Sequence, residues 1–153
     1  KEGDGFKIAM SALDVGRIGI AAMSTGIAQG CLDESIKYSK ERVQFKKPIA
    51  SQQAIQWFIA DMSVDIDAAR FFYMNAAWIK DQGKPFSLAA SKAKLFCSEC
   101  AARHSTKAVQ IQGGYGFMKG AKVERFYRDV KLAEIGEGTS EAQRMIIAGS
   151  ALR

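Results

Sequence analysis

Apolar residues recur along this chain at the three- and four-residue spacing of amphipathic helices, with polar residues between them. The pattern is interrupted at Pro48, which disfavours helical geometry in the residue before it, and at Gly83, which suits a helix end. Ser51 is the expected N-cap of the second helix. The spacing predicts helices over residues 8–46, 51–80, 87–112, 123–130 and 140–152.

Signals for β-structure are missing from the sequence. Period-two alternation is not found, and the early Asp-Gly pair at Asp4 has no strand pattern beside it. Three of the expected helices would each be roughly 40 to 55 Å long at 1.5 Å per residue, joined by short connections. These proportions predict an all-α fold, an up-and-down antiparallel four-helix bundle with a shorter fourth helix. All 153 residues fit one domain.

The composition is that of an ordinary globular protein, with 48% hydrophobic and 25% charged residues and a net charge of +6. Lysines and arginines are interspersed with acidic residues, so we do not expect nucleic-acid binding. The longest uncharged stretch, residues 18–32, is diluted by glycine and polar residues, whereas a membrane span needs roughly 20 apolar residues. We expect neither a membrane span nor a secretory signal, because the start KEGDGFK does not lead into an apolar stretch.

Three cysteines favour a reducing compartment over a disulfide scaffold. Cys97 and Cys100 form a CxxC motif, but zinc would need a second ligand pair, and the only histidine, His104, lies in the same stretch. The motif lies inside a helical pattern, which argues against a thioredoxin-like redox pair. We therefore expect no metal site and interpret these residues as inert thiols on a helix face.

One loop, QIQGGYGF from Gln110 to Phe117, has more glycine than a helix end needs. Its glycines could let backbone amides approach a phosphate or a neighbouring chain closely, or they could form an ordinary tight turn. The segment is not a dinucleotide-binding fingerprint, because it follows a helix and lacks the third glycine. By itself the loop favours the tight turn.

A second loop, IGEGTSEAQR, places Glu137 between two glycines just before the last helix. Ser140 and Gln143 match the spacing of a capping box at the start of that helix. The Glu137 carboxylate either favours the positive end of the helix dipole or acts as a positioned general base. The residues alone favour the first interpretation.

Several separated segments resemble the C-terminal α-helical domain of the acyl-CoA dehydrogenase family, most closely its short-chain, butyryl-CoA-like branch. In chain order these segments are LDVGRIGIAA, YSKERVQFKKPI, SQQAIQWFIADM, QIQGGYGF, YRDVKLAEI and EGTSEAQRMIIA. Each would be weak alone, but together they are in register along essentially the whole chain. The resemblance implies that residues 1–153 form the C-terminal bundle of an enzyme whose N-terminal and middle domains are absent from this chain.

The resemblance further implies an FAD-dependent enzyme that converts a short- to medium-chain acyl-CoA to the trans-2-enoyl-CoA. Electron-transfer flavoprotein would accept the electrons, and the enzyme would be a homotetramer built as a dimer of dimers. It would lie in the bacterial cytoplasm, which is favoured, or in the mitochondrial matrix. The isolated chain would be inactive, since most of the flavin pocket lies elsewhere. The alternative is a non-enzymatic helical module that assembles through the same surface.

By the same resemblance, Glu137 is the base that takes the α-proton of the acyl group while a hydride leaves the β-carbon. The FAD contacts at residues 42–53 and 110–114 would reach the flavin of a neighbouring subunit. The residues that match the family's substrate contacts are Asp14, Val15, Gly16, Arg17 and Gly138. The residues that match its FAD contacts are Arg42, Phe45, Gln53, Gln110, Ile111, Gln112, Gly113, Gly114, Thr139, Ser140 and Glu141.

Three residues leave questions for the structure. Lys46 stands where the family usually has glycine, and it either perturbs the FAD contact or adds a cation near phosphate. Gly136 stands where a tyrosine or similar bulky residue commonly precedes the base, which leaves the acyl chain length and branching open. Arg17 is a cation near the CoA portion by resemblance, but the residues alone favour a solvated helix charge.

Overall fold

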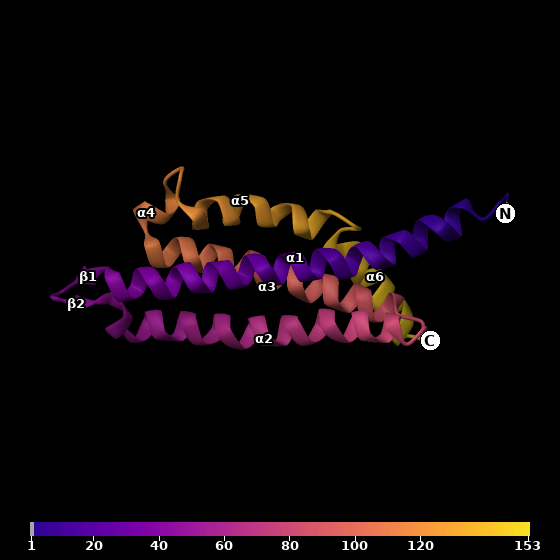
Figure 1. The fold of residues 1–153 in the computed structure, drawn as a ribbon, viewed down its shortest axis with the longest axis horizontal. Coiled ribbons are helices and arrows are strands. Elements are labelled where there is room, and N and C mark those ends of the chain that lie inside the picture. Colours follow the sequence, from indigo (N-terminus) through magenta and orange to yellow (C-terminus); the bar gives the residue numbers. More distant parts are fainter. Residues whose placement is uncertain (1) are drawn as a thin grey trace.

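In the computed structural model, which describes residues 2–153, three long helices are followed by two shorter ones (Figure 1). The all-α class is confirmed. The helices are α1 (Gly5–Glu41), α2 (Gln53–Asp81), α3 (Ser87–Gln112), α5 (Lys122–Ile135) and α6 (Ser140–Ala151), and the short elements are β1 (Val43–Gln44), β2 (Lys47–Pro48), the 3-10 turn η1 (Ile49–Ser51) and α4 (Gly114–Phe117).

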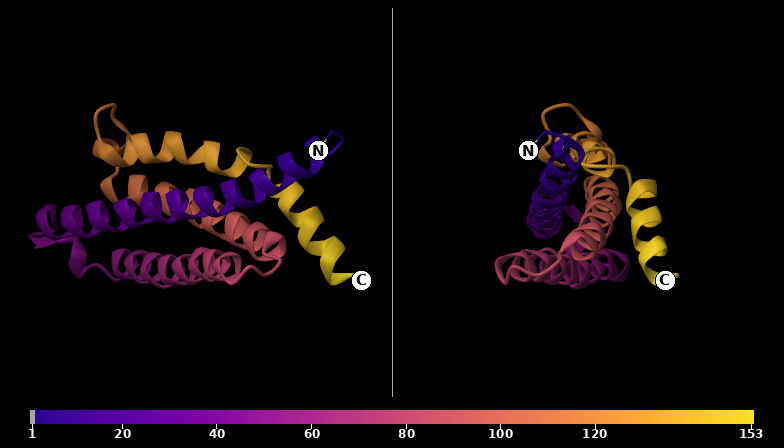
Figure 2. Two further views of the ribbon diagram at one scale, coloured as in Figure 1. Left: turned by 45° about the vertical axis from the view of Figure 1, so that its right-hand side comes forward. Right: turned by 90° about the vertical axis from the view of Figure 1, so that its right-hand side faces the viewer.

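Helices α1, α2, α3 and α5 form the predicted up-and-down bundle (Figure 1). Each runs opposite to the one before it, so α1 and α3 run in the same direction and pack along each other as a central pair. Helix α2 covers one side of this pair and α5 the other. Figure 2 shows that α6 leaves the end of α5 at a steep angle and packs on α3. The turn between α5 and α6 therefore lies near the first half of α1.

The central pair meets through small side chains. Ala21 and Ala28 of α1 and Ala93 and Ala101 of α3 are fully buried. Small residues let two helix backbones approach closely, and larger side chains such as Met62 of α2 fill the remaining space. This close packing fixes the relative positions of α1 and α3, on which the functional residues depend.

The first helix ends earlier than predicted, because the backbone becomes extended at Arg42 (φ −73°, ψ 121°). Strands β1 and β2 then form a two-residue antiparallel hairpin. Phe45 and Lys46 occupy its turn with φ of 51° and 66°, the left-handed pair that a type I′ turn requires. Such turns are normally signalled by Asn-Gly or Asp-Gly, so this hairpin gives no signal in the sequence.

Two further boundaries differ from the prediction. Ser51 is not the N-cap of α2, because it lies in η1, where its hydroxyl donates to the Pro48 carbonyl (2.8 Å). Gln52 is the residue before the helix, and its side chain makes no capping hydrogen bond. Helix α5 continues beyond Val130 to Ile135, because Ala133 extends its buried face.

The outer side of α2 carries an exposed row of apolar side chains. Trp57, Val64, Phe71 and Trp78 follow one another at seven-residue spacing, which keeps them on one side of the helix, and each is more than half exposed. Met74 lies between the last two and is also exposed. We call these five residues the α2 apolar face. Within residues 2–153, none of the helices has the length and hydropathy of a membrane span.

Candidate active site and cofactor pocket

Glu137 lies in the turn between α5 and α6. The backbone is left-handed at both Glu137 (φ 57°) and Gly138 (φ 93°). Gly136 ends α5, and its amide donates to the Leu132 carbonyl at 2.8 Å. A left-handed conformation is uncommon for a residue other than glycine, so surrounding contacts must hold Glu137 in it.

The Glu137 carboxylate lies directly over Gly16 of α1. A Cβ atom at position 16 would be 2.4 Å from Oε2 of Glu137, so the absence of a side chain there leaves room for the carboxylate. Glu137 itself is half-buried. The predicted base and the predicted acyl-CoA segment, residues 14–17, thus lie together although they are far apart in the sequence.

Arg17 is buried beneath this turn, with 7% of its surface exposed, so the interpretation as a solvated helix charge is wrong. Its Nη1 pairs with the Asp14 carboxylate at 2.7 Å, and its Nε donates to the Glu137 carbonyl at 3.3 Å. The Ser87 hydroxyl donates to the same Asp14 oxygen at 2.9 Å. Arg17 therefore joins α1 to the backbone of the turn, while Val15 beside it is exposed.

Helix α6 begins one residue earlier than the predicted capping box requires. Thr139 is the N-cap, and its hydroxyl accepts a hydrogen bond from the Ala142 amide at 3.3 Å. Ser140 is already helical, so the box at Ser140 and Gln143 is wrong, and the Gln143 side chain turns back toward the Glu137 turn. Hydrogen bonds from its own amide and from the Thr139 hydroxyl lower the pKa of Glu141, as suits a carboxylate in a first helical turn.

At the other end of the bundle, an open pocket of about 690 Å³ lies between the hairpin and the end of α3. The Arg42 guanidinium lies over the Tyr115 ring, 5.7 Å from its centre. Phe45, at the hairpin turn, is 87% exposed. The predicted FAD contacts that line this pocket are Arg42, Phe45, Ile111, Gln112, Gly113 and Gly114.

The remaining predicted FAD contacts lie elsewhere. Gln53 is the first residue of α2 and does not line the pocket, whereas its neighbour Gln52 does. Gln110 lines a different pocket, of about 740 Å³, between α3 and α5. Residues 139–141 lie beside Glu137 at the start of α6. The predicted contacts therefore form two groups at opposite ends of the bundle.

The side chains of the hairpin pocket suit one end of a dinucleotide such as FAD. Ile49 and Ile55 offer an apolar wall for a base, and the Gln52 amide offers both a donor and an acceptor. Arg42 presents a fork that suits phosphate oxygens. The backbone at Gly113 is left-handed (φ 59°), and a Cβ atom there would meet nothing within 4 Å, so a ligand can approach the main chain closely at this position.

Sequence reasoning missed several residues around both groups. Tyr38 lines the pocket one helical turn before Arg42, and that spacing could have indicated it. Gln52 and Tyr115 also line the pocket, and neither had a signal in the sequence. Lys94, in the first third of α3, is fully buried, and burial lowers its pKa although nearby Glu134 raises it.

The cysteines of the CxxC motif are fully buried and unpaired. Burial raises the pKa of Cys97 to about 11 and that of Cys100 to about 12, so both thiols are protonated at neutral pH. Donor atoms of Cys100, His104 and Asp65 lie within 4.8 Å of one another. Asp65 Oδ2 is already 2.9 Å from His104 Nε2 and 3.1 Å from the Arg103 guanidinium, the arrangement of a hydrogen-bonded ion pair.

This chain belongs to the acyl-CoA dehydrogenase family, because the model of that family's C-terminal domain matches residues 3–152. It is 55% identical over 149 residues to the probable acyl-CoA dehydrogenase YngJ of Bacillus subtilis, covering 97% of this chain and 39% of YngJ. It is 52% identical over 149 residues to CarC, a subunit of the caffeyl-CoA reductase–Etf complex of Acetobacterium woodii, again covering 97% of this chain and 39% of the relative.

The fold agrees with a solved structure at a similar level of identity. The structure of butyryl-CoA dehydrogenase from Megasphaera elsdenii superposes with a TM-score of 0.98 at 49% identity, over all of this chain and 40% of that chain. The chain thus spans about two fifths of the length of these relatives.

Proposed function

We propose that this chain is the C-terminal, base-bearing domain of an FAD-dependent acyl-CoA dehydrogenase acting on short- to medium-chain acyl-CoA. In this proposal an N-terminal and a middle domain belong to the same enzyme. The observation that carries the proposal is the half-buried Glu137 carboxylate over Gly16, inside the segment that matches the family's acyl-CoA site. Family membership supports the reaction class.

In the proposed reaction Glu137 is the general base. Its carboxylate takes the α-proton of the thioester, the electron pair of that C–H bond forms the Cα–Cβ double bond, and the β-hydrogen leaves as hydride. When bound, FAD supplies the hydride acceptor, and the protein supplies the position of the base. The name of the relative CarC indicates reduction in that protein. In that direction the same carboxylic acid would return the proton, by microscopic reversibility.

The two groups of FAD contacts support a site shared between subunits. Gly16, beside the base, and Arg42, in the pocket, are separated along α1 by about 39 Å at 1.5 Å per residue. This is farther apart than the two halves of one FAD can lie. Residues 139–141 would therefore contact the flavin of their own subunit, while the hairpin pocket would hold the adenosine end of a neighbour's flavin.

The α2 apolar face supports the proposed homotetramer. Its large residues are arranged symmetrically about the middle of α2, so an antiparallel copy of the helix would place Trp57 against Trp78 and Val64 against Phe71. An exposed apolar surface of this kind is typical of a subunit contact. Substituting Phe71→Glu in the complete protein should shift the sedimentation coefficient toward smaller species, whereas Lys80→Gln, with the same charge change, should not. An unchanged assembly would exclude this contact.

The remaining parts of the proposal concern partners and compartment. CarC is named as part of a complex with Etf, which supports electron-transfer flavoprotein as the electron acceptor. The proposed location is the bacterial cytoplasm or the mitochondrial matrix. The isolated chain is expected to lack activity, because it contributes only two separated parts of a flavin site.

The test of the base is Glu137→Gln in the complete protein. We expect the turnover number with butyryl-CoA to fall by about 10³-fold, within the range of a lost general base, and the flavin content to stay normal. Glu134→Gln, in the same segment, should leave turnover nearly unchanged. Normal turnover by the Glu137 variant would refute the assignment. A complete protein that purifies without flavin and takes up no added FAD would favour the non-enzymatic module.

A further inference from the structure

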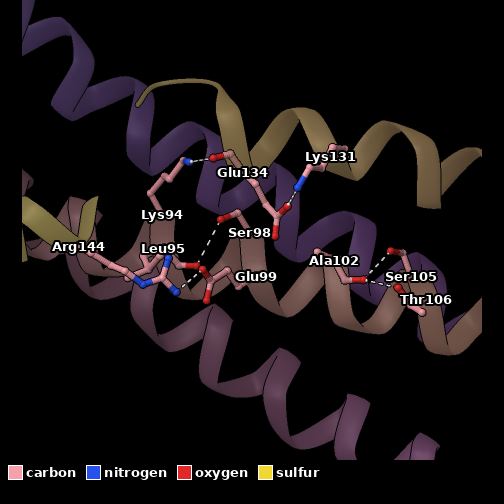
Figure 3. A network of polar contacts seen from close by, with 10 residues as sticks. All are labelled: Lys94, Leu95, Ser98, Glu99, Ala102, Ser105, Thr106, Lys131, Glu134 and Arg144. Atoms are coloured by element: carbon pink, nitrogen blue, oxygen red, sulfur yellow. Dashed lines mark hydrogen bonds and ion pairs between the residues drawn. The ribbon is translucent and has the colours of Figure 1, made fainter. Parts of the chain in front are cut away.

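Three buried side chains from three helices donate hydrogen bonds to the backbone carbonyls around Glu137. Lys94 of α3 reaches the Glu134 carbonyl at 3.1 Å, and Figure 3 shows its amine beside that oxygen. Arg17 of α1 reaches the Glu137 carbonyl. Gln143 of α6 reaches the Glu137 carbonyl at 3.2 Å and the Gly138 carbonyl at 3.0 Å with a single Nε2.

These carbonyls need such donors for a structural reason. The last carbonyl groups of α5 have no partner within the helix, and the left-handed turn that follows cannot supply one. The left-handed conformation of Glu137 costs roughly 1 kcal/mol by itself. The donated hydrogen bonds therefore select this turn over the extended alternatives.

Gln143 occupies the central place in this arrangement. It is fully buried, and its Oε1 has no hydrogen-bond partner among the described residues. An unpaired buried acceptor is unfavourable by about 1–3 kcal/mol, so an apolar residue would serve packing better. What an apolar residue could not do is donate to two consecutive carbonyls of the turn.

The position of Gly138 agrees with this role. A Cβ atom on Gly138 would lie 2.8 Å from the Gln143 Nε2, and the backbone there is left-handed. The turn can therefore accept the amide only because position 138 has no side chain. Gly16 leaves room for the Glu137 carboxylate in the same way, so Gly16 and Gly138 both make space around the base.

We propose that Gln143 is a positioning residue for the base, whose side-chain amide, together with Arg17, holds the Glu137 turn so that the carboxylate stays over Gly16. This inference rests on the proposed function of Glu137. Among the described residues, the Gln143 amide hydrogen-bonds to backbone carbonyls of the turn, and in this proposal it takes no part in proton transfer. Its contribution is to keep the carboxylate within reach of the α-carbon.

The experiment uses Gln143→Met and Gln143→Asn in the complete protein. Met keeps the length and removes the donor, and Asn keeps the amide but is one methylene too short. A displacement of about 1 Å can lower a rate by about 10²-fold, so we expect the turnover number to fall 10- to 100-fold with the KM for acyl-CoA changed less than about threefold. Arg144→Met, at the next position on an exposed part of α6, is the control.

A second measurement separates positioning from general stability. Exchange of the substrate α-proton with deuterated water requires the base but not turnover of the flavin. We expect this exchange to fall in the Gln143 variants by the same factor as turnover, with flavin content retained. Normal exchange in Gln143→Met, or loss of folding in both variants, would overturn the inference. If Glu137→Gln also exchanges normally, the proposed function itself fails.

Discussion

The two ends of the bundle differ in how much of their site this chain completes by itself. At the Glu137 end, Arg17 and Gln143 are buried and use their donors on the turn that carries the base. At the hairpin end, Phe45 is largely exposed, and the described side-chain contact of Arg42 is with the ring of Tyr115. The comparison indicates that at one end this chain positions the Glu137 side chain by its own contacts. At the other end, the site needs a ligand and a neighbouring chain to complete it.

The largest effect expected on stability is at the Glu137 end. Arg17→Met removes the cation beside Asp14 and a donor to the Glu137 carbonyl. Removing one partner of a largely buried ion pair costs about 3 kcal/mol, so the free energy of unfolding in urea should fall by about that amount. Arg144→Met, which breaks an exposed pair with Glu99, should cost less than about 1 kcal/mol. Equal losses of unfolding free energy in the two variants would show that the buried pair stabilises the protein no more than the exposed pair.

The next prediction tests the contact between α1 and the base. Gly16→Ala places a methyl group where the Glu137 carboxylate lies, so the carboxylate must move away. We expect turnover to fall about 10- to 100-fold without loss of stability, since alanine favours a helix by roughly 0.5–1 kcal/mol.

Gly19→Ala on the same helix is the matched control, because a Cβ atom there meets nothing within 4 Å. It should gain the same helical stability and keep full turnover. Steady-state kinetics with butyryl-CoA and thermal unfolding give both readouts. A Gly16→Ala protein with normal turnover would mean that the carboxylate acts from another position.

A smaller effect is expected at the hairpin end. Arg42→Met removes the cation of the pocket, and FAD should bind about tenfold more weakly, which corresponds to about 1.4 kcal/mol. Titration of flavin-free complete protein with FAD measures the change. Arg125→Met is the control, because Arg125 also lies 5.7 Å from an aromatic ring, that of Phe126, but outside the pocket. The same loss in both variants would remove Arg42 from the FAD site.

The smallest effect concerns the hairpin turn. Lys46 has a φ of 66°, which glycine adopts without strain, so Lys46→Gly should stabilise the protein by about 1 kcal/mol. Because the Lys46 amine is not needed to shape the turn, FAD affinity should be unchanged. A fall in FAD affinity would instead show that this amine contributes a cation near the phosphates. Thermal unfolding and the same FAD titration distinguish the two.

Much of the fold could be predicted from local patterns. The apolar spacing identified the main helices, and Gly83 and Gly113 marked where two of them end. The hairpin was missed because Phe45 and Lys46 take left-handed conformations that their side chains do not favour. Ser51 and Ser140 were misplaced as caps, since serine suits several positions near a helix start and only hydrogen bonding decides among them.

The candidate site was predicted less completely. Family motifs indicated Glu137 and residues 14–17, which the fold brings together. Lys94 was not recognised as a donor to the turn, because a lysine in a helical pattern is normally a surface charge. Gln143 was not recognised either, because its position in the sequence was explained by the N3 place of the predicted capping box.

By itself the sequence determined the helical class, the approximate helix lengths and the family, because apolar periodicity and motif order are local properties of the chain. Only the tertiary structure decided that Glu137 lies over Gly16 and that Arg17 and Gln143 meet at one carbonyl. Those contacts join residues of α1, α6 and the turn between α5 and α6, and they depend on how closely the small side chains let α1 and α3 pack. Spacing along the chain carries no information about that distance.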